Sequence, residues 1–286
     1  MMGMKKYYHA PVPGLIAFVM VFIWQGLGHT VMVLMEHVFG QAWVFQSAFI
    51  VGLAGAICVW IGRNKPELSA TLWGFAGGSL IWTGWIEFSF VWVADYLGIP
   101  AVGETEPEYR IMPSSIGVMV ATLVFFYFNK DTRCNAFRWL HRYTHMNPGH
   151  AHSGQGRNIS AIVAMEAIYV TWFFYIALLL LYDERWAGDR HPATYVAFFV
   201  FMVWGIYLLQ RLLRFQRVAP AVRYGIPTAI ILWNLWEIGS RWGIVTDFWI
   251  RPLDYARELA VIGLGLTAVI VLSIVSPARQ PADSPG

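Results

Sequence analysis

Apolar stretches long enough to cross a lipid bilayer recur along almost the whole chain. A helix needs about 20 residues to cross the ~30 Å hydrocarbon core. The stretches lie at about 13–39, 42–61, 69–96, 114–128, 159–182, 193–213, 222–239 and 259–275. Only 13% of the 286 residues are charged, whereas about a quarter are charged in an ordinary soluble domain. We therefore predict an all-α integral membrane protein, a polytopic bundle of about eight transmembrane helices.

Basic residues are distributed unevenly between the connections of these spans. With eight spans, one side of the membrane holds 14 of the 20 Lys and Arg residues. The opposite side holds the other six, namely Arg110, Arg185, Arg190, Arg241, Arg251 and Arg257. Because cytoplasmic loops are enriched in basic residues, both termini are predicted to be cytoplasmic. A count of seven spans would remove the alternation of basic and less basic connections, so eight is the preferred count. The membrane is expected to be a bacterial inner (plasma) membrane.

Two of the apolar stretches resemble each other. Ile81 to Pro100 and Leu232 to Pro252 each surround a glutamate with tryptophans and end in proline. The pairs in matching places are Trp82 and Trp233, Trp85 and Trp236, Glu87 and Glu237, Trp92 and Trp242, and Asp95 and Asp247. This match suggests a 4+4 parallel repeat. The alternative is that tryptophan gathers near the interfaces of any membrane protein.

The spans and loops divide the chain into four parts. Residues 1–128 form a first four-helix half, and residues 129–158 form a cytoplasmic loop rich in His and Arg. Residues 159–276 form the second half, and the Pro-rich tail 277–286 is expected to be disordered.

Glu87 and Glu237 are the candidate catalytic or proton-binding residues, because a carboxylate inside an apolar span is costly unless a bundle interior or a cavity holds it. Glu87 shares a helix face with small residues, including Gly77 and Gly84. This pattern predicts that Glu87 is buried against another helix. For Glu237, an ion pair with Arg241 one turn later is an alternative explanation.

The first span carries a polar stripe. Gln25, His29, Met32 and Glu36 fall on one helix face, and His37 follows Glu36. Imidazole and carboxylate ligands suit Zn, Fe or Cu. A transition-metal site is therefore predicted with the ligands His29, Glu36, His37 and Glu87. The alternative is a set of interhelical hydrogen bonds, with Glu36 and His37 in solvent.

The long connection after the fourth span offers an alternative metal site. Its four candidate ligands are His141, His145, His150 and His152. The first two would share a helix face, and a Pro-Gly turn could fold the others back on them. The competing interpretation is a basic loop that faces anionic lipids, in which the histidines are incidental.

Three functions remain open at this level. The first is a metal-binding membrane oxidoreductase or another lipid-facing enzyme, whose Trp-rich spans could bind a lipophilic small molecule. The second is a proton- or cation-coupled secondary transporter, which the suspected repeat and Pro227 inside the seventh span favour. The third is a structural or assembly subunit that contacts other membrane proteins. The expected partners are therefore the lipid bilayer, a lipophilic small molecule and other membrane subunits. Nucleic acid is not expected as a partner.

Overall fold

The structure, a computed structural model, describes residues 9–101, 106–132, 134–149 and 157–275. These residues are 80% helical, and they contain no strand. The elements in chain order are α1 (Val12–Gly62), α2 (Glu67–Ile81), the π-helix η2 (Trp82–Glu87), α3 (Phe88–Tyr96), α4 (Pro107–Ile111), the 3-10 helix η3 (Met112–Ser115), α5 (Ile116–Phe128), α6 (Asn135–Tyr143), α7 (Ile159–Tyr182), α8 (Pro192–Leu212), α9 (Val218–Arg241), the 3-10 helix η5 (Phe248–Ile250) and α10 (Ala256–Val275).

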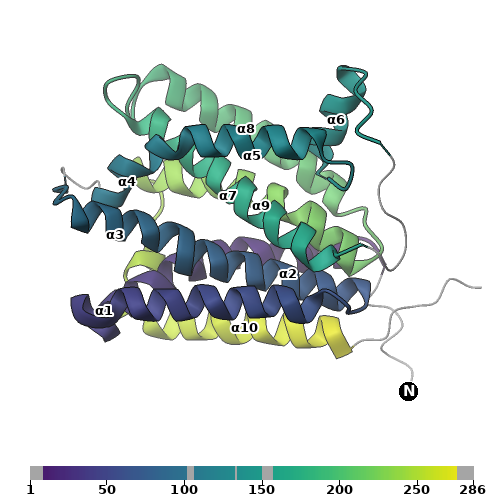
Figure 1. Ribbon diagram of the computed structural model, residues 1–286, viewed down its shortest axis with the longest axis horizontal. Coiled ribbons are helices and arrows are strands. Elements are labelled where there is room, and N and C mark those ends of the chain that lie inside the picture. Colours follow the sequence, from purple (N-terminus) through teal and green to yellow (C-terminus); the bar gives the residue numbers. More distant parts are fainter. Residues whose placement is uncertain (1–8, 102–105, 133, 150–156, 276–286) are drawn as a thin grey trace, which may run out of the picture.

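Long helices run side by side in alternating directions and form an elongated bundle (Figure 1). The start of α1 and the end of α10 lie at the same end of the bundle. This arrangement is the one that an even number of crossings requires.

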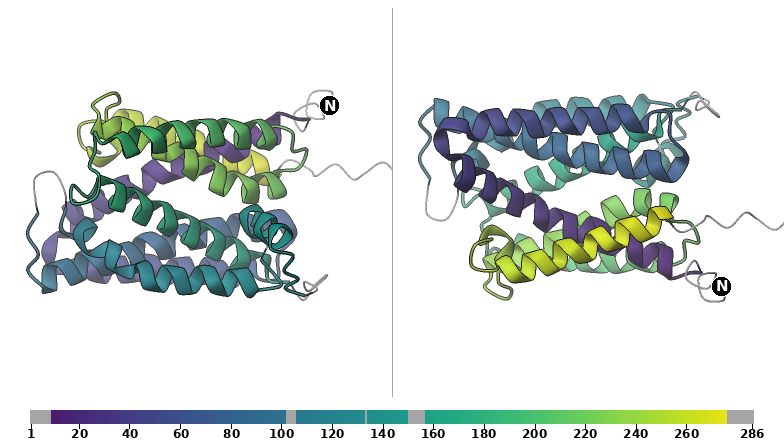
Figure 2. Two further views of the ribbon diagram at one scale, coloured as in Figure 1. Left: turned by 90° about the horizontal axis from the view of Figure 1, so that it is seen from above. Right: turned by 90° about the horizontal axis from the view of Figure 1, so that it is seen from below.

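Helix α1 is broken in the middle at Gly40. Gly40 has φ 57° and ψ −177°, a combination that only glycine adopts without strain. Figure 2 shows the first arm of α1 beside α10 and the second arm beside α2. The break therefore lets one helix join two groups of helices, and it separates the first two predicted spans.

Glycines allow α2 and its π-helical continuation to pack closely on two neighbours. A Cβ atom on Gly84 would lie 2.4 Å from the backbone nitrogen of Gly52 in α1. On Gly78 it would lie 2.6 Å from the carbonyl oxygen of Ala164 in α7. Contact between backbones through small residues is the usual packing mode inside membranes, so the predicted small-residue face is used as expected.

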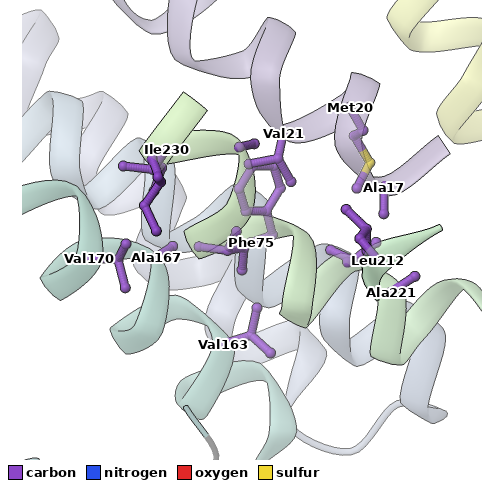
Figure 3. Close-up of a cluster of buried hydrophobic side chains, with 14 of the residues drawn as sticks. Ala17, Met20, Val21, Phe75, Val163, Ala167, Val170, Leu212, Ala221 and Ile230 are labelled. Atoms are coloured by element: carbon purple, nitrogen blue, oxygen red, sulfur yellow. The ribbon is translucent and has the colours of Figure 1, made fainter. Parts of the chain in front are cut away.

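The main apolar core lies where α1, α2, α7 and α9 meet (Figure 3). Its members include Ala17 and Val21 of α1, Phe75 of α2, Val163 of α7 and Ile230 of α9. The outer faces of the helices are also apolar, in contrast to those of a soluble bundle. The large exposed side chains include Trp43, Phe49, Val203 and Leu264.

Four helical stretches in the described ranges are long and apolar enough to cross a membrane. They are α1, the run Pro107–Phe128 formed by α4, η3 and α5, then α7 and α8. The helical fold is thus confirmed, together with apolar helices that could span a membrane. The count of eight spans and the 4+4 repeat are not confirmed, and the division into halves and the bacterial inner membrane stay predictions.

Candidate functional site

Glu87 is enclosed by protein at the end of the π-helix η2. Its exposed fraction is 3%, and the Tyr175 hydroxyl of α7 donates a hydrogen bond of 3.0 Å to its Oε1 atom. The ring of Trp82, from the start of η2, packs 5.7 Å from the ring of Tyr175. The prediction that Glu87 is buried against another helix is confirmed. Single π-helical turns inside longer helices often mark functional sites.

Glu237 lies in the last turns of α9 and contacts His29 of α1. The distance from His29 Nε2 to Glu237 Oε1 is 3.6 Å. The Trp233 indole donates a hydrogen bond of 2.6 Å to the same carboxylate oxygen. Trp233 also stacks on the imidazole of His29, with ring planes 16° apart. His29 is therefore held against Glu237 from one side by an aromatic ring.

The alternative explanation for Glu237, an ion pair with Arg241, is wrong. Arg241 lies with its Nη1 atom 3.3 Å from Asp189 Oδ1, and its guanidinium covers the Tyr182 ring at 4.0 Å. Asp189 lies in the connection between α7 and α8. The ion pair therefore links the end of α9 to this connection. Glu237 instead contacts His29 and accepts the hydrogen bond from Trp233.

Tyr175 connects the two carboxylates. Its hydroxyl binds Glu87, and its ring stacks against His29 with the centroids 6.3 Å apart. Tyr109 of α4 packs 6.1 Å from Tyr175 on another side. The two glutamates predicted as site residues, Glu87 and Glu237, thus lie in one cluster. Its side chains come from α1, η2, α7 and α9.

Two adjoining cavities surround this cluster. The first, of about 40 Å³, reaches Glu87, and the second, of about 80 Å³, reaches Glu237 and Arg241. Five residues line both cavities, namely Gln25, His29, Thr171, Tyr175 and Ile230. A polar cavity holds a water molecule once about 10–15 Å³ is accessible to its centre. Both cavities are therefore large enough for water.

Polar atoms without a partner line the second cavity. The Asn234 amide nitrogen and the Tyr182 hydroxyl are buried and have no hydrogen-bond partner among the residues that the structure describes. A buried polar atom is normally satisfied by protein, water or a ligand. The second cavity is thus suited to small polar guests.

The predicted transition-metal site is not supported. Glu36 and His37 are exposed beside the break at Gly40. They follow His29 by seven and eight residues, which corresponds to about 10–12 Å along the helix. His29 and Glu87 alone cannot complete a ligand set. In the described ranges, no three His, Cys, Asp or Glu side chains are placed to hold a metal ion.

The alternative four-histidine site lies only partly within the described residues. His141 Nε2 is hydrogen-bonded to the Tyr127 carbonyl oxygen at 2.6 Å, and His145 is exposed. His150 and His152 lie outside the described ranges, so this alternative stays a prediction.

The sequence analysis missed Tyr175 and Tyr109. Thr171 and Tyr175 stand one turn apart on a face of an apolar span, and both line the two cavities. Such a polar pair on one face is a usable signal for a buried site. Tyr109 follows an acidic connection, and no polar pair on an apolar helix face indicates from the sequence that it is part of a buried site.

The chain matches no model of a protein family, and no curated protein or solved structure matches it. Its apolar helices are consistent with a membrane protein. Function must therefore be inferred from the site itself: two buried carboxylates, a histidine and a tyrosine around small polar cavities.

Proposed function

We propose that the protein is a proton-coupled secondary transporter in which Glu87 and the His29–Glu237 pair bind the coupling proton. One observation carries this proposal: four helices bring the protonatable side chains of Glu87, Tyr175, His29 and Glu237 into successive contact inside the bundle. Ionisable residues inside membrane spans commonly form such proton relays.

The size of the cavities favours a proton over a bulky substrate at this point. Pockets for drug-sized ligands measure about 300–1,000 Å³, whereas the cavities here measure about 40 and 80 Å³. Tyr175 and His29 line both, so water in either cavity contacts both side chains. A water molecule in either cavity would link the two side chains for proton transfer where their rings merely stack.

The charges near the site favour a proton over a metal cation. Arg241 lines the cavity that contains Glu237, and His29 lies beside the carboxylate. The fixed guanidinium of Arg241 repels a metal cation, whereas an imidazole and a carboxylate can share a proton.

Helices that surround the site are interrupted, as transporter helices often are near their ion sites. A π-helical turn ends at Glu87 itself, and α9, which carries Glu237, contains Pro227 ten residues before that glutamate. Interruptions of this kind allow part of a helix to move without the rest. They support a transporter over a rigid assembly subunit.

Proton flux into liposomes tests the proposal. The purified protein is reconstituted with a pH-sensitive dye inside, and a potassium gradient with valinomycin drives proton uptake. We expect the wild type to show uptake above that of empty liposomes, and Glu87→Gln and Glu237→Gln to abolish the excess. Glu258→Gln is the matched control, because Glu258 is exposed in the first turn of α10.

A second readout makes the result independent of an unknown substrate. Infrared difference spectra between acid and alkaline pH report carboxyl groups that change their protonation. We expect Glu87→Gln to remove a buried-carboxyl band that Glu258→Gln leaves in place. If Glu87→Gln showed the same proton flux and the same infrared difference spectrum as the wild type, the proposal would be overturned. A structural or assembly subunit would then be the preferred interpretation.

A further inference from the structure

Arginine side chains gather at the end of the bundle where α2, α7 and α9 begin. They surround a cavity of about 330 Å³ between these helices and α6. Arg138 of α6, Arg157 before α7 and Arg223 of α9 line it, together with Glu67 and Glu166. This end lies in the opposite half of the bundle from the Glu87 cluster, and its cavity shares no lining residue with the two cavities there.

A groove between the end of α8 and the start of α9 extends the cavity outward. Arg211, Arg214 and Arg217 line the groove, and Phe215, Pro220 and Tyr224 line both hollows. The two hollows together are lined by six arginines and two glutamates. The surface thus carries a clear excess of positive charge.

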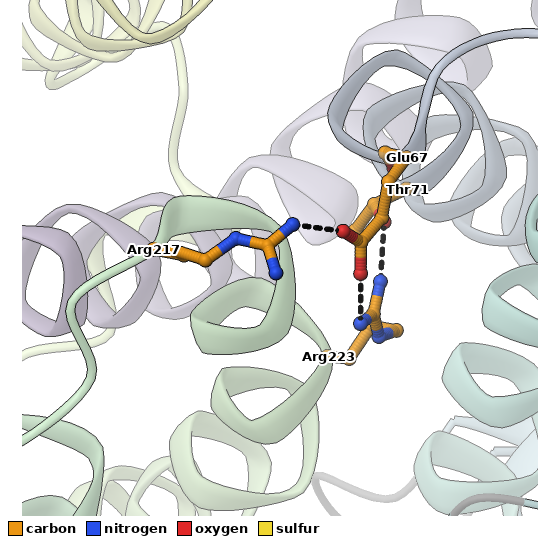
Figure 4. A network of polar contacts seen from close by, with 4 residues as sticks. All are labelled: Glu67, Thr71, Arg217 and Arg223. Carbon is orange, nitrogen blue, oxygen red and sulfur yellow. Dashed lines mark hydrogen bonds and ion pairs between the residues drawn. The ribbon is translucent and has the colours of Figure 1, made fainter. Parts of the chain in front are cut away.

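Glu67 fixes two of these arginines in place (Figure 4). Arg223 donates hydrogen bonds to Glu67 Oε1 at 2.7 Å and to the Thr71 hydroxyl at 3.0 Å, and Arg217 pairs with Glu67 Oε2. Partial burial alone would raise the pKa of Glu67. The hydrogen bonds and charges of Arg223 and Arg217 outweigh that effect and lower this pKa. One ionised carboxylate therefore orients two guanidinium groups without cancelling both charges.

The walls below the arginines are mostly apolar, with Glu166 and Tyr169 among them. They include Ile159, Ile162, Val170 and Pro227. Val170 follows Ile159 by eleven residues, which corresponds to about 16 Å along α7. The hollow therefore leads from a charged rim into the apolar depth of the bundle.

Exposed side chains around the rim are typical of a membrane interface. Tyr207 at the groove is 52% exposed, and Val203 one turn deeper on α8 is 66% exposed. On α6, the exposed rings of Trp139 and Tyr143 stack 5.4 Å apart, next to Arg138. Aromatic residues at headgroup level with apolar residues below match the order of groups in a phospholipid.

We propose that this arginine-lined cavity and groove bind an anionic phospholipid, with the phosphate held by the arginines and an acyl chain along the exposed face of α8. Guanidinium groups hold phosphate oxygens in pairs of hydrogen bonds. Basic pockets between membrane helices on the cytoplasmic side are suited to anionic headgroups. The cavity volume of about 330 Å³ lies within the range of ligand pockets.

Native mass spectrometry of the full chain in mixed micelles tests this site. Phosphatidylglycerol and phosphatidylcholine are titrated separately, and the apparent Kd of the first bound lipid is measured. The test variant is Arg138→Gln with Arg214→Gln, since both side chains are exposed and neither has an ion pair with a carboxylate in the described ranges. The control, Arg190→Gln with Arg257→Gln, removes two exposed arginines at the other end of the bundle.

We expect phosphatidylglycerol to bind the wild type more tightly than phosphatidylcholine. An arginine near an anionic headgroup changes binding about fivefold, so the test variant should weaken it by about 30-fold and the control by much less. Arg138→Lys with Arg214→Lys should restore much of the affinity, which shows that charge rather than folding is responsible.

Three outcomes would overturn the assignment: equal affinity for the two lipids, an equal loss in the control, or no loss in the test variant. Inorganic phosphate is added in a further arm. Weak competition by phosphate supports a lipid, because the acyl chain then contributes to binding. Competition at the same concentration as the lipid would assign the site to a soluble phosphate instead.

Discussion

Replacement of Glu87 by glutamine and by lysine should separate the role of its charge from its role in packing. The side chain is 3% exposed, and its carboxylate accepts the Tyr175 hydroxyl at 3.0 Å. Glutamine is nearly isosteric and retains an oxygen acceptor for that hydroxyl. Lysine offers no acceptor and places an ammonium group in the same enclosed position.

The magnitudes follow from these contacts. A hydrogen bond to a charged group contributes about 1.5–3 kcal/mol and one between neutral groups about 0.5–1.5 kcal/mol, so Glu87→Gln should cost about 1 kcal/mol. A lysine in a span costs about 2.5–3.5 kcal/mol, and the unsatisfied Tyr175 hydroxyl adds about 1–3 kcal/mol. Glu87→Lys should therefore cost about 3.5–6.5 kcal/mol, a large part of a typical stability of about 5–15 kcal/mol.

Thermal unfolding in detergent measures these differences, and the 15 tryptophans provide the fluorescence signal. Glu258→Lys and Glu258→Gln serve as controls at an exposed glutamate and should change the Tm little. A double-mutant cycle with Tyr175→Phe should give a coupling of about 1 kcal/mol if the hydrogen bond forms. If Glu87→Lys were purified in normal yield and unfolded at the wild-type temperature, Glu87 would not be enclosed and the central site would be refuted.

Three further changes test the fold and its charges by thermal or denaturant unfolding. Gly40→Ala should lower the free energy of unfolding by about 1–3 kcal/mol because alanine strains that backbone conformation, although no atom lies within 4 Å of the added group; an unchanged Tm would argue against the break. Gly78→Leu should cost more than about 1–3 kcal/mol because its Cβ would lie 2.6 Å from the Ala164 carbonyl oxygen, and wild-type stability would disprove that close approach. Glu67→Gln should cost about 1 kcal/mol at pH 7, discounted for solvent screening. Because the pKa of Glu67 is lowered in the folded protein, that stabilisation is present above the unfolded pKa of about 4.3 and is lost as the pH falls through the folded pKa. The difference between the wild type and Glu67→Gln should thus vanish in acid, and a difference that persists there would rule out the ion pairs with Arg217 and Arg223.

Local properties of the sequence determined the helical elements and the burial of Glu87. Apolar runs separated by charged and Pro- or Gly-containing connections predict helices, because a backbone in lipid must satisfy its own hydrogen bonds. Helices α7 (Ile159–Tyr182) and α8 (Pro192–Leu212) lie within one residue of the predicted spans. Burial of Glu87 followed from the cost of a carboxylate in an apolar segment and from the glycines on its face.

The partners of these residues were decided by the tertiary structure alone. Spacing along α9 allowed Glu237 to pair with Arg241, yet the packing of α1 against α9 brings His29 to Glu237, while Arg241 reaches Asp189. The polar stripe of the first span predicts one ligand set, but the break at Gly40 leaves its last members exposed at the end of an arm. Helical periodicity fixes which side chains share a face. It does not fix how neighbouring helices rotate, cross and break, and those three features decide which side chains meet across the bundle.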